Sequence, residues 1–447
     1  HYTLGQRFRD KGFAGGKVDD FRVYQRALTA LEIAQLHDGD SLTQALAEGD
    51  PDTLRNYYLS AIDPGFRKHS EALRVARQRL VKAEDTMLEL PVMEEMKKPR
   101  PTFILARGAY DSPKDRPALR NTPGFLPPMP GAYPNNRLGF AKWAVSNNHP
   151  LTARVFVNRV WQEFFGQGLV KTPENFGMQG ELPTHPDLLD WLARDFVDHG
   201  WDIKRLCKQI VLSSTYRQRS SLSPELREKD PENLLLARAP AYRLSAEMIR
   251  DTALAASGLL DTQMGGKPVA PYQAGGDLWR ENNGMSPAFR QSVGTALYRR
   301  SLYSVWKRTA PFPNMIVFDA ASREVCTVKR ARTNTPLQAL VLLNDTQFVE
   351  AARVLAARHL DADNQLNIRA AFTSLTGRDP TADEYKLLTD LNREQLDHFR
   401  QNTAAALKLL KVGAHPIPKS PVAPAHHAAA TVTVQTIFNL DASVWKR

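Results

Sequence analysis

The stretch from His149 to Arg219, HPLTARVFVNRVWQEFFGQGLVKTPENFGMQGELPTHPDLLDWLARDFVDHGWDIKRLCKQIVLSSTYRQR, decides the fold class. Its apolar residues recur every three or four positions, which is the spacing of one face of an α-helix, and Gly166 ends the first such run. Thr184 and Asp187 form a capping-box pattern before the second run, and Asp202 precedes the third. The stretch therefore predicts three capped helices.

Helix start signals recur along the rest of the chain. Ser245, Thr335 and Thr381 each stand where an N-cap residue would precede an apolar helical pattern. Between the first two, residues 265–296 are rich in Gly and Asn and predict a long loop. Many capped helices and few alternating patterns predict a mainly α fold for the greater part of the chain.

The first 98 residues follow a different pattern. Apolar and polar residues roughly alternate over Val18–Tyr24, which predicts a strand, and Thr29 with Glu32 predicts a capped helix after it. Residues 1–39 resemble the last segment of a laminin-G-like, concanavalin-type jelly roll, so a small β remnant is expected there. Residues 40–98 are charged and helical in pattern, which predicts a helical connector.

Prolines mark the remaining boundaries. Residues 99–134 carry many prolines, which fix φ and remove backbone donors, so we expect an extended arm there. This arm and the helices after it are expected to form one domain over residues 99–410. Residues 411–447 are expected to form a linker-like tail, rich in Ala, Pro and His over residues 414–430, and a C-terminal segment.

Composition limits the class of protein. The chain has 447 residues, of which 42% are hydrophobic and 24% charged, as in ordinary globular proteins. No run of about 18 apolar residues occurs, so no membrane span is predicted. The net charge of +11 is spread along the chain and raises the affinity for polyanions of any kind. The chain starts at His1 without a signal-peptide pattern, so we expect that the true N-terminus lies further upstream.

Two cysteines occur, Cys207 and Cys326. Neither belongs to a C-x-x-C or C-x-x-C-H pattern, so neither a zinc ribbon nor an attached c-type haem is predicted within this sequence. Cys207 lies on the apolar side of a helical pattern and is expected in the core. Whether the two form a disulfide is left open by the sequence.

The densest group of polar side chains lies just before Thr335. Seven candidate site residues fall within twelve positions: Arg323, Glu324, Cys326, Lys329, Arg330, Arg332 and Asn334. If the helix N-terminus that follows faces a cleft, its N–H groups and these arginines would bind an anion. Glu324 and Cys326 are then the candidate catalytic residues, and the other five are candidate binding residues. The alternative is a set of ion pairs that fixes a loop to the helical core.

A second candidate surface lies on the first helix of the opening stretch. Asn158, Arg159 and Trp161 are candidate sugar-binding residues, because a Trp ring stacks on sugars while Asn and Arg bond hydroxyl groups. The alternative is that Trp161 is a core residue and that the Arg159 stem covers the core. His185, near Asp187, has no second His at i+3 or i+4, so no metal site is predicted.

Two long patterns, residues 149–219 and SREVCTVKRARTNTPLQALVLLND (Ser322–Asp345), resemble one family. It is the PSD1 domain, also called DUF1553, of large secreted proteins from planctomycetes and related bacteria, and its activity is unassigned. The resemblance covers roughly residues 86–348. The final NLDASVWKR (Asn439–Arg447) also resembles the end of this family, although Ala442 replaces its usual acidic residue.

The resemblance implies a cellular setting. Similar proteins usually carry a signal peptide and a c-type cytochrome domain upstream, often with a laminin-G-like insert. It therefore implies an extracytoplasmic protein, which is periplasmic, at the cell surface or secreted. Any haem would belong to an upstream region outside this sequence, so no cofactor is expected in this chain.

Two functions remain open at this point. The first is a binding or scaffolding domain in polysaccharide processing or electron transfer, whose partner is a carbohydrate or a protein of the same secreted system. The second is an enzyme that acts on an anionic, for example sulfated, carbohydrate through the Arg323–Asn334 cluster. Binding of another polyanion or of nucleic acid is the weaker third alternative.

Overall fold

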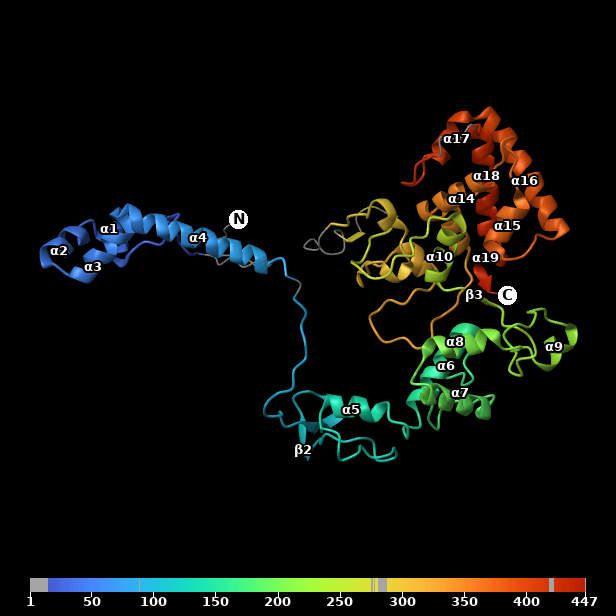
Figure 1. Cartoon of the computed structure of the whole chain (residues 1–447), viewed down its shortest axis with the longest axis horizontal. Helices are drawn as coiled ribbons and strands as arrows, with labels where there is room; N and C mark the ends of the chain where they lie inside the picture. Colours follow the sequence, from blue (N-terminus) through green and yellow to red (C-terminus); the bar gives the residue numbers. More distant parts are fainter. Residues whose placement is uncertain are drawn as a thin grey trace. The chain divides into compact units, whose positions relative to one another are not determined.

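Helices make up most of the regular structure of this chain. The computed structural model describes residues 15–87, 89–274, 276, 278–279, 288–417 and 422–446. They belong to two units, His1–Thr102 and Phe103–Arg447. The strands found in the described residues form two small two-stranded sheets (Figure 1). The mainly α prediction is thus confirmed. Of the helices described, none has the length and apolar character needed to cross a membrane.

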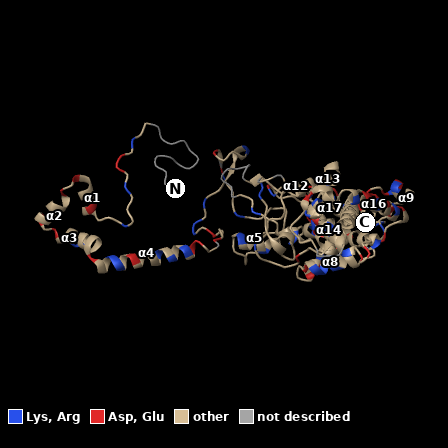
Figure 2. Ribbon diagram, turned by 90° about the horizontal axis from the view of Figure 1, so that it is seen from above, with Lys and Arg blue, Asp and Glu red and all other residues tan. Residues whose placement is uncertain are grey.

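The described part of the first unit contains helices, three of which begin at capping side chains. Its elements are α1 (Ala30–Asp38), α2 (Ser41–Glu48), α3 (Pro51–Tyr57), the π-helical turn η1 (Tyr58–Ile62) and α4 (Pro64–Glu84). Thr29 and Glu32 form the predicted capping box of α1. The Asp63 side chain accepts a hydrogen bond from the backbone N of Phe66 at the start of α4. The colours of the ribbon in Figure 2 show basic residues along α4 with acidic residues among them.

The strand predicted over Val18–Tyr24 is wrong. This segment forms no strand in the described part of the unit, and Val18, Phe21 and Val23 are 57–68% exposed. A strand needs a neighbour that takes its backbone hydrogen bonds, and the described residues of this unit supply none. The alternating pattern alone carries no information about such a neighbour.

The second unit begins with a hairpin and a proline-rich segment. Strand β1 (Phe103–Leu105) pairs antiparallel with β2 (Pro113–Pro117) across the 3₁₀ turn η2 (Ala106–Gly108). Helix α5 (Arg137–Ala144) follows, and its buried Trp143 donates from Nε1 to the carbonyl oxygen of Pro127 at 2.7 Å. This bond holds the end of the proline-rich segment against α5.

Three helices share the smaller of two large cores. They are α6 (Thr152–Phe165), α7 (Pro186–Asp198) and α8 (Ile203–Leu212), as the opening stretch predicts. Asp202 caps α8 as predicted, by accepting from the backbone N of Arg205. The predicted capping box at Thr184 and Asp187 is wrong, because α7 starts at Pro186 and its N-cap residue makes no side-chain cap. Proline at the first helical position has no N–H to satisfy, which removes part of the need for a cap.

The described part of the second unit holds further helices, most of which surround the larger core. These are α9 (Pro224–Lys229), α10 (Ala246–Ser257), α12 (Pro313–Val317), α13 (Pro336–Asn344), α14 (Thr346–His359), α15 (Ile368–Thr376), α16 (Ala382–Gln401), α17 (Thr403–Leu410), α18 (Pro424–Phe438) and α19 (Asp441–Val444), with 3₁₀ turns at Gly294–Tyr298 and Ser301–Tyr303. The predicted caps at Ser245, Thr335 and Thr381 are all confirmed. Strands β3 (Tyr242–Arg243) and β4 (Trp445–Lys446) pair antiparallel and bring the end of the chain beside α6.

The linker-like character predicted for the tail is wrong from Pro424 onward. Helix α18 lies between α14 and α16, and Ala428, Val434 and Ile437 on it have no exposed surface (Figure 1). A helix that is buried on all sides has no polar face, so it carries no amphipathic signal. The small alanine side chains of α18 let the neighbouring helices approach closely. In the sequence these alanines appear only as a segment of low complexity.

Candidate functional site

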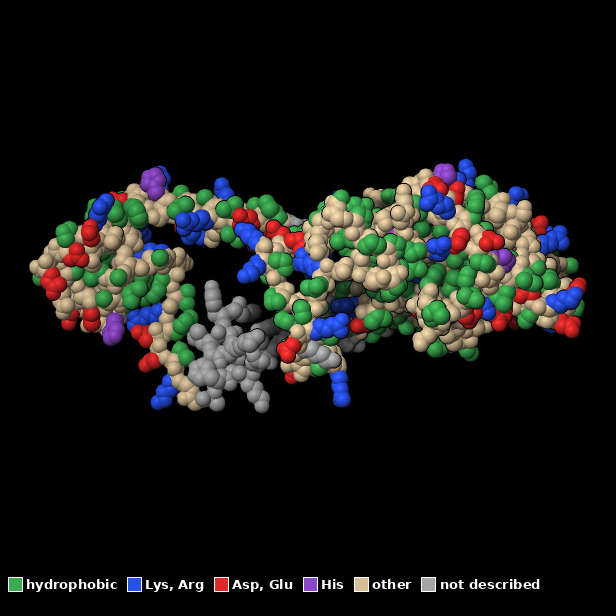
Figure 3. Space-filling view, turned by 90° about the horizontal axis from the view of Figure 1, so that it is seen from below, with side chains coloured by type: hydrophobic (Ala, Val, Ile, Leu, Met, Phe, Trp, Pro, Cys, Tyr) green, Lys and Arg blue, Asp and Glu red, His purple; other side chains and the backbone are tan. Residues whose placement is uncertain are grey.

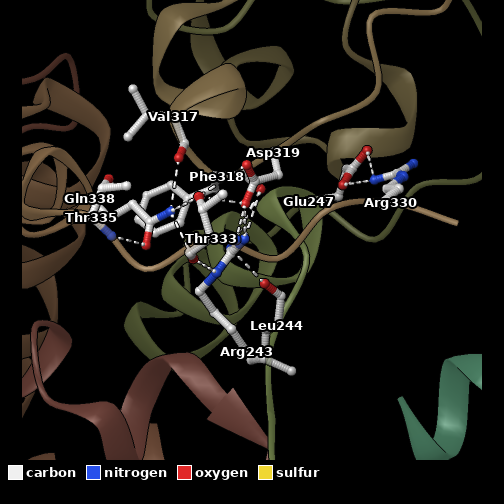
Figure 4. A network of polar contacts seen from close by, with 10 residues as sticks. All are labelled: Arg243, Leu244, Glu247, Val317, Phe318, Asp319, Arg330, Thr333, Thr335 and Gln338. Atoms are coloured by element: carbon white, nitrogen blue, oxygen red, sulfur yellow. Dashed lines mark hydrogen bonds and ion pairs between the residues drawn. The ribbon is translucent and has the colours of Figure 1, made fainter. Parts of the chain in front are cut away.

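The predicted polar cluster lies on the irregular segment between α12 and α13, and a buried arginine fixes the base of that segment. The guanidinium of Arg243 pairs with the carboxylate of Asp319 and donates from Nε to the carbonyl oxygen of Thr333 at 2.9 Å (Figure 4). Gln338 donates from Nε2 to the carbonyl oxygens of Val317, at 3.0 Å, and of Thr333. Burial lowers the pKa of Arg243, and Asp319 opposes that shift. The two ends of the segment are therefore held together.

The arginines of the predicted cluster point to different partners. Arg330 donates to both carboxylate oxygens of Glu247, at 3.0 and 2.8 Å (Figure 4). Arg323 stacks on the ring of Trp306, 4.8 Å from its centroid. For these two residues the contacts match the structural interpretation, in which charges fix the loop. Arg332 extends to the C-terminal end of α6 instead.

The remaining cluster residues are exposed. The side chains of Glu324, Cys326, Lys329 and Asn334 make no hydrogen bond or ion pair with any described residue. Cys326 is a free thiol, as is the partly buried Cys207. The structure therefore does not bring Glu324 and Cys326 into contact with a base or an arginine of the cluster.

A cavity of about 350 Å³ lies at the C-terminal end of α6. Its apolar wall includes Trp161, Phe165, Leu169, Leu234 and Leu236. Its polar wall includes Gln167, Thr184, Ser220, Asn233, Arg238, Tyr242 and Arg332. Two residues from separate sequence predictions, Trp161 and Arg332, thus line one cavity, although 171 positions separate them.

Three side chains donate to backbone carbonyl groups at this end of α6. Tyr242 OH donates to the oxygen of Glu163, Lys446 Nζ to that of Phe164 at 2.6 Å, and Arg332 Nη1 to that of Gly166 at 3.0 Å. Cations are favoured at a helix C-terminus because the helix dipole is negative there. Burial lowers the pKa of Lys446 to about 8 and raises that of Tyr242 to about 12.

Several polar groups on the cavity wall remain available to a ligand. Arg332 lies 4.3 Å from the centroid of the Tyr242 ring and makes one hydrogen bond, through Nη1. Its Nη2 and Nε, and the side chains of Gln167 and Ser220, have no partner among the described residues. Arg238, by contrast, already donates to two backbone carbonyl groups. Among the described residues that line the cavity, Arg332 is therefore the cation available to a ligand.

Glycine is required beside this cavity. Gly166 ends α6 with φ of +77°, and an added Cβ would lie 2.6 Å from Cδ1 of Tyr242 and 3.0 Å from Nη1 of Arg332. Any side chain here would therefore strain the backbone and displace the two residues that line the cavity. The sequence marks Gly166 only as a helix end.

The predicted sugar-binding trio on α6 does not share one exposed surface. Asn158 has no exposed surface and bonds the backbone of Val170, whereas Arg159 is exposed. Trp161 is 5% exposed and stacks on Phe165, so most of its surface is buried in the core, as the alternative interpretation expects.

The sequence did not predict the wall residues Gln167, Ser220 and Arg238, because they lie in irregular segments where no spacing pattern marks a site. In the described part of the chain, no three His, Cys, Asp or Glu residues gather to hold a metal.

Comparisons with known proteins give one family. Residues 136–392, more than half of the chain, match the family described as "PSD1: Protein of unknown function (DUF1553)". No curated protein and no solved structure matches the chain significantly.

Proposed function

The chain belongs to the PSD1 family, and on that premise we propose that it is a binding module that takes an anionic carbohydrate at the C-terminal end of α6. One observation carries this proposal: Arg332 lines a cavity that also has aromatic walls, and two of its guanidinium nitrogens have no hydrogen-bond partner among the described residues. The module requires no catalytic group, and its affinity would come from one cation, aromatic faces and amide or hydroxyl groups.

The cavity suits a charged sugar for three physical reasons. Its volume lies within the range of about 300–1,000 Å³ that is typical of small-molecule sites. A guanidinium forms paired, charge-assisted hydrogen bonds with carboxylate or sulfate oxygens. The ring of Tyr242 offers apolar contact to the C–H face of a sugar, while Gln167 and Ser220 can bond hydroxyl groups.

Binding is favoured over the other functions considered. An enzyme that uses Glu324 and Cys326 would need them close to a base or to substrate-binding arginines, and both are exposed without such contacts. Nucleic-acid binding usually relies on a continuous basic surface. In the view of Figure 3, Lys and Arg side chains are scattered among acidic and apolar ones. A small anionic ligand needs only the local charge of Arg332.

The proposed setting follows the resemblance of the sequence. We propose an extracytoplasmic location, with a carbohydrate or a protein of the same secreted system as partner. The protein would take part in polysaccharide processing or electron transfer. Any haem would be carried by a region outside this sequence. The resemblance supports this setting, whereas the cavity supports only the class of ligand.

Calorimetric titration with a sulfated disaccharide and its unsulfated counterpart tests the proposal. The sulfated sugar is expected to bind more tightly, and its affinity should fall as salt is added. Arg332→Ala should weaken binding at least tenfold, and Arg332→Lys should weaken it less, because lysine keeps the charge but loses the paired donors. Arg330→Ala is the matched control, since its partner Glu247 lies outside the cavity lining. Absence of binding, or equal effects at both arginines, would contradict the proposal.

A further inference from the structure

A second polar centre lies inside the larger core, on α14. Glu350 and Arg353 are 0% and 1% exposed, yet they form no ion pair with each other. Glu350 Oε1 accepts hydrogen bonds from the hydroxyl groups of Tyr272 and Tyr298, at 3.1 and 3.0 Å. Two buried charges that are not in direct contact need other partners between them.

The backbone of a later segment bridges the two charges. We call residues 412–417 the strap. The backbone N of His415 donates to Glu350 Oε1 at 2.6 Å, and the carbonyl oxygen of His415 accepts from Arg353 Nη2 at 2.7 Å. The backbone N of Ala414 donates to Tyr272 OH at 2.7 Å. The carboxylate and the guanidinium therefore hold the two backbone groups of one residue, whatever its side chain.

Glycine at position 413 is what allows the strap to approach so closely. Gly413 has φ of +92°, and an added Cβ would lie 2.3 Å from Glu350 Oε1 and 2.5 Å from its Cδ. No side chain fits there without moving the buried carboxylate or the strap. The arrangement thus selects a glycine two residues before the residue that is held.

The strap leaves this centre incompletely satisfied. Glu350 Oε2 and the Nε and Nη1 atoms of Arg353 are buried and have no hydrogen-bond partner among the described residues. An unsatisfied buried polar atom of a charged group destabilises the state that contains it. An occupant that also offered a donor to Oε2 and an acceptor to the guanidinium would therefore make hydrogen bonds with this centre that the strap does not make.

We infer that Glu350, Arg353, Tyr272 and Tyr298 form a clamp for peptide backbone, and that the strap is its internal, competing occupant. The ligand class is an extended peptide with glycine two residues before the held residue and a polar side chain that reaches the unsatisfied atoms. Binding requires the strap to lift. The apparent affinity for the peptide is therefore the intrinsic affinity multiplied by the fraction of molecules in which the strap is open. This site is independent of the carbohydrate cavity.

Hydrogen exchange tests the first step. Gly413→Ala should open the strap and raise the exchange rates of the Ala414 and His415 amides at least tenfold. Gly377→Ala is the matched control, because Gly377 also has a positive φ, of +71°, but an added Cβ there meets no atom within 4 Å. Unchanged exchange at Ala414 and His415 in folded Gly413→Ala protein would overturn the inference.

Peptide binding tests the second step. The probe is the synthetic strap peptide VGAHPI, with VAAHPI as its control. Gly413→Ala protein should bind VGAHPI at least tenfold more tightly than wild-type protein does, and should bind VAAHPI at least tenfold more weakly than VGAHPI. Adding Glu350→Gln should weaken binding of VGAHPI. If the strap opens and neither peptide binds, the clamp holds only its own strap and ordered water, and the inference fails.

A second measurement covers the case in which Gly413→Ala protein does not fold. Excess VGAHPI added to the wild-type chain must then compete with the strap directly. The exchange rates of the Ala414 and His415 amides should rise with peptide concentration, whereas VAAHPI should leave them unchanged. If neither peptide changes the exchange rates of the Ala414 and His415 amides, the inference is refuted.

Discussion

Asn158 on α6 exchanges two hydrogen bonds with the backbone of Val170: its Nδ2 donates to the Val170 carbonyl at 3.0 Å, and Val170 N donates to its Oδ1 at 2.9 Å. The amide side chain thus pairs with a main chain as a neighbouring strand would. Gly168 permits this contact, since an added Cβ would lie 2.6 Å from Asn158 Nδ2. The turn that follows α6, and with it one wall of the cavity, depends on this side chain.

Asn158→Leu should lower the free energy of unfolding by about 2–4 kcal/mol, because two buried backbone groups of Val170 lose their partners. Denaturant unfolding measures the change. Arg159→Ala, at the exposed neighbouring position, should change stability by no more than about 0.5 kcal/mol. An equally small effect at Asn158 would mean that the pair does not hold the turn.

The two thiols should differ in reactivity. Cys326 is exposed and Cys207 is partly buried, so a thiol reagent should modify Cys326 in the native protein at least tenfold faster than Cys207. Cys326→Ser should remove the fast phase and Cys207→Ser should keep it. Titration of the unfolded chain without reductant should find both thiols free. Loss of sulfated-sugar binding after modification of Cys326 would place that residue at the site, contrary to the cavity proposal.

Local signals of the sequence predicted the helices well. A capping residue and its partner lie three positions apart, so Asp202, Ser245 and Thr381 could be assigned from the sequence alone. The Val18–Tyr24 strand failed because its outcome depends on a partner elsewhere. Helix α18 was missed because burial on all sides removes the periodicity that reveals a helix.

The candidate site was less predictable than the fold. Arg332 and Gly166 are 166 positions apart, and Lys446 and Phe164 are 282 apart, yet these contacts shape the end of α6. Sequence spacing carries no information about such pairs. The dense polar segment was a sound place to look, but only Arg332 of its seven residues lines the cavity. The high density of charged residues at 323–334 belongs to a loop that ion pairs and stacking fix in place.

The buried helix that the sequence missed can be tested with one charge. Ala428→Asp should cost more than about 4 kcal/mol, because Ala428 has no exposed surface and a carboxylate there would lack a partner. Ala404→Asp is the control, since Ala404 is exposed in the first turn of α17, where a negative charge is favoured. Circular dichroism during heating compares the two. A cooperative transition in Ala428→Asp protein within a few degrees of wild type would contradict the central position of α18.

The capping box of α16 should give a defined pH dependence. Hydrogen bonds from Arg378 lower the pKa of Glu384 from its ordinary 4.5 to about 2. Because the folded-state pKa lies below the unfolded one, the stabilisation is fully present above pH 4.5 and is lost as pH falls toward 2. The Glu384 side chain is 29% exposed, so solvent limits the contribution of the pair to about 1 kcal/mol.

Glu384→Gln keeps the shape of the side chain and an oxygen that can accept from Thr381 N, so it removes mainly the charge. Its free energy of unfolding should lie about 1 kcal/mol below that of wild type at pH 7, and the difference should disappear near pH 2. Urea unfolding at a series of pH values measures both quantities. Glu394→Gln, at an exposed position of the same helix, should track wild type throughout. A difference at Glu384 that persists at pH 2 would show that the amide disturbs packing, and that the charge is not what stabilises this helix start.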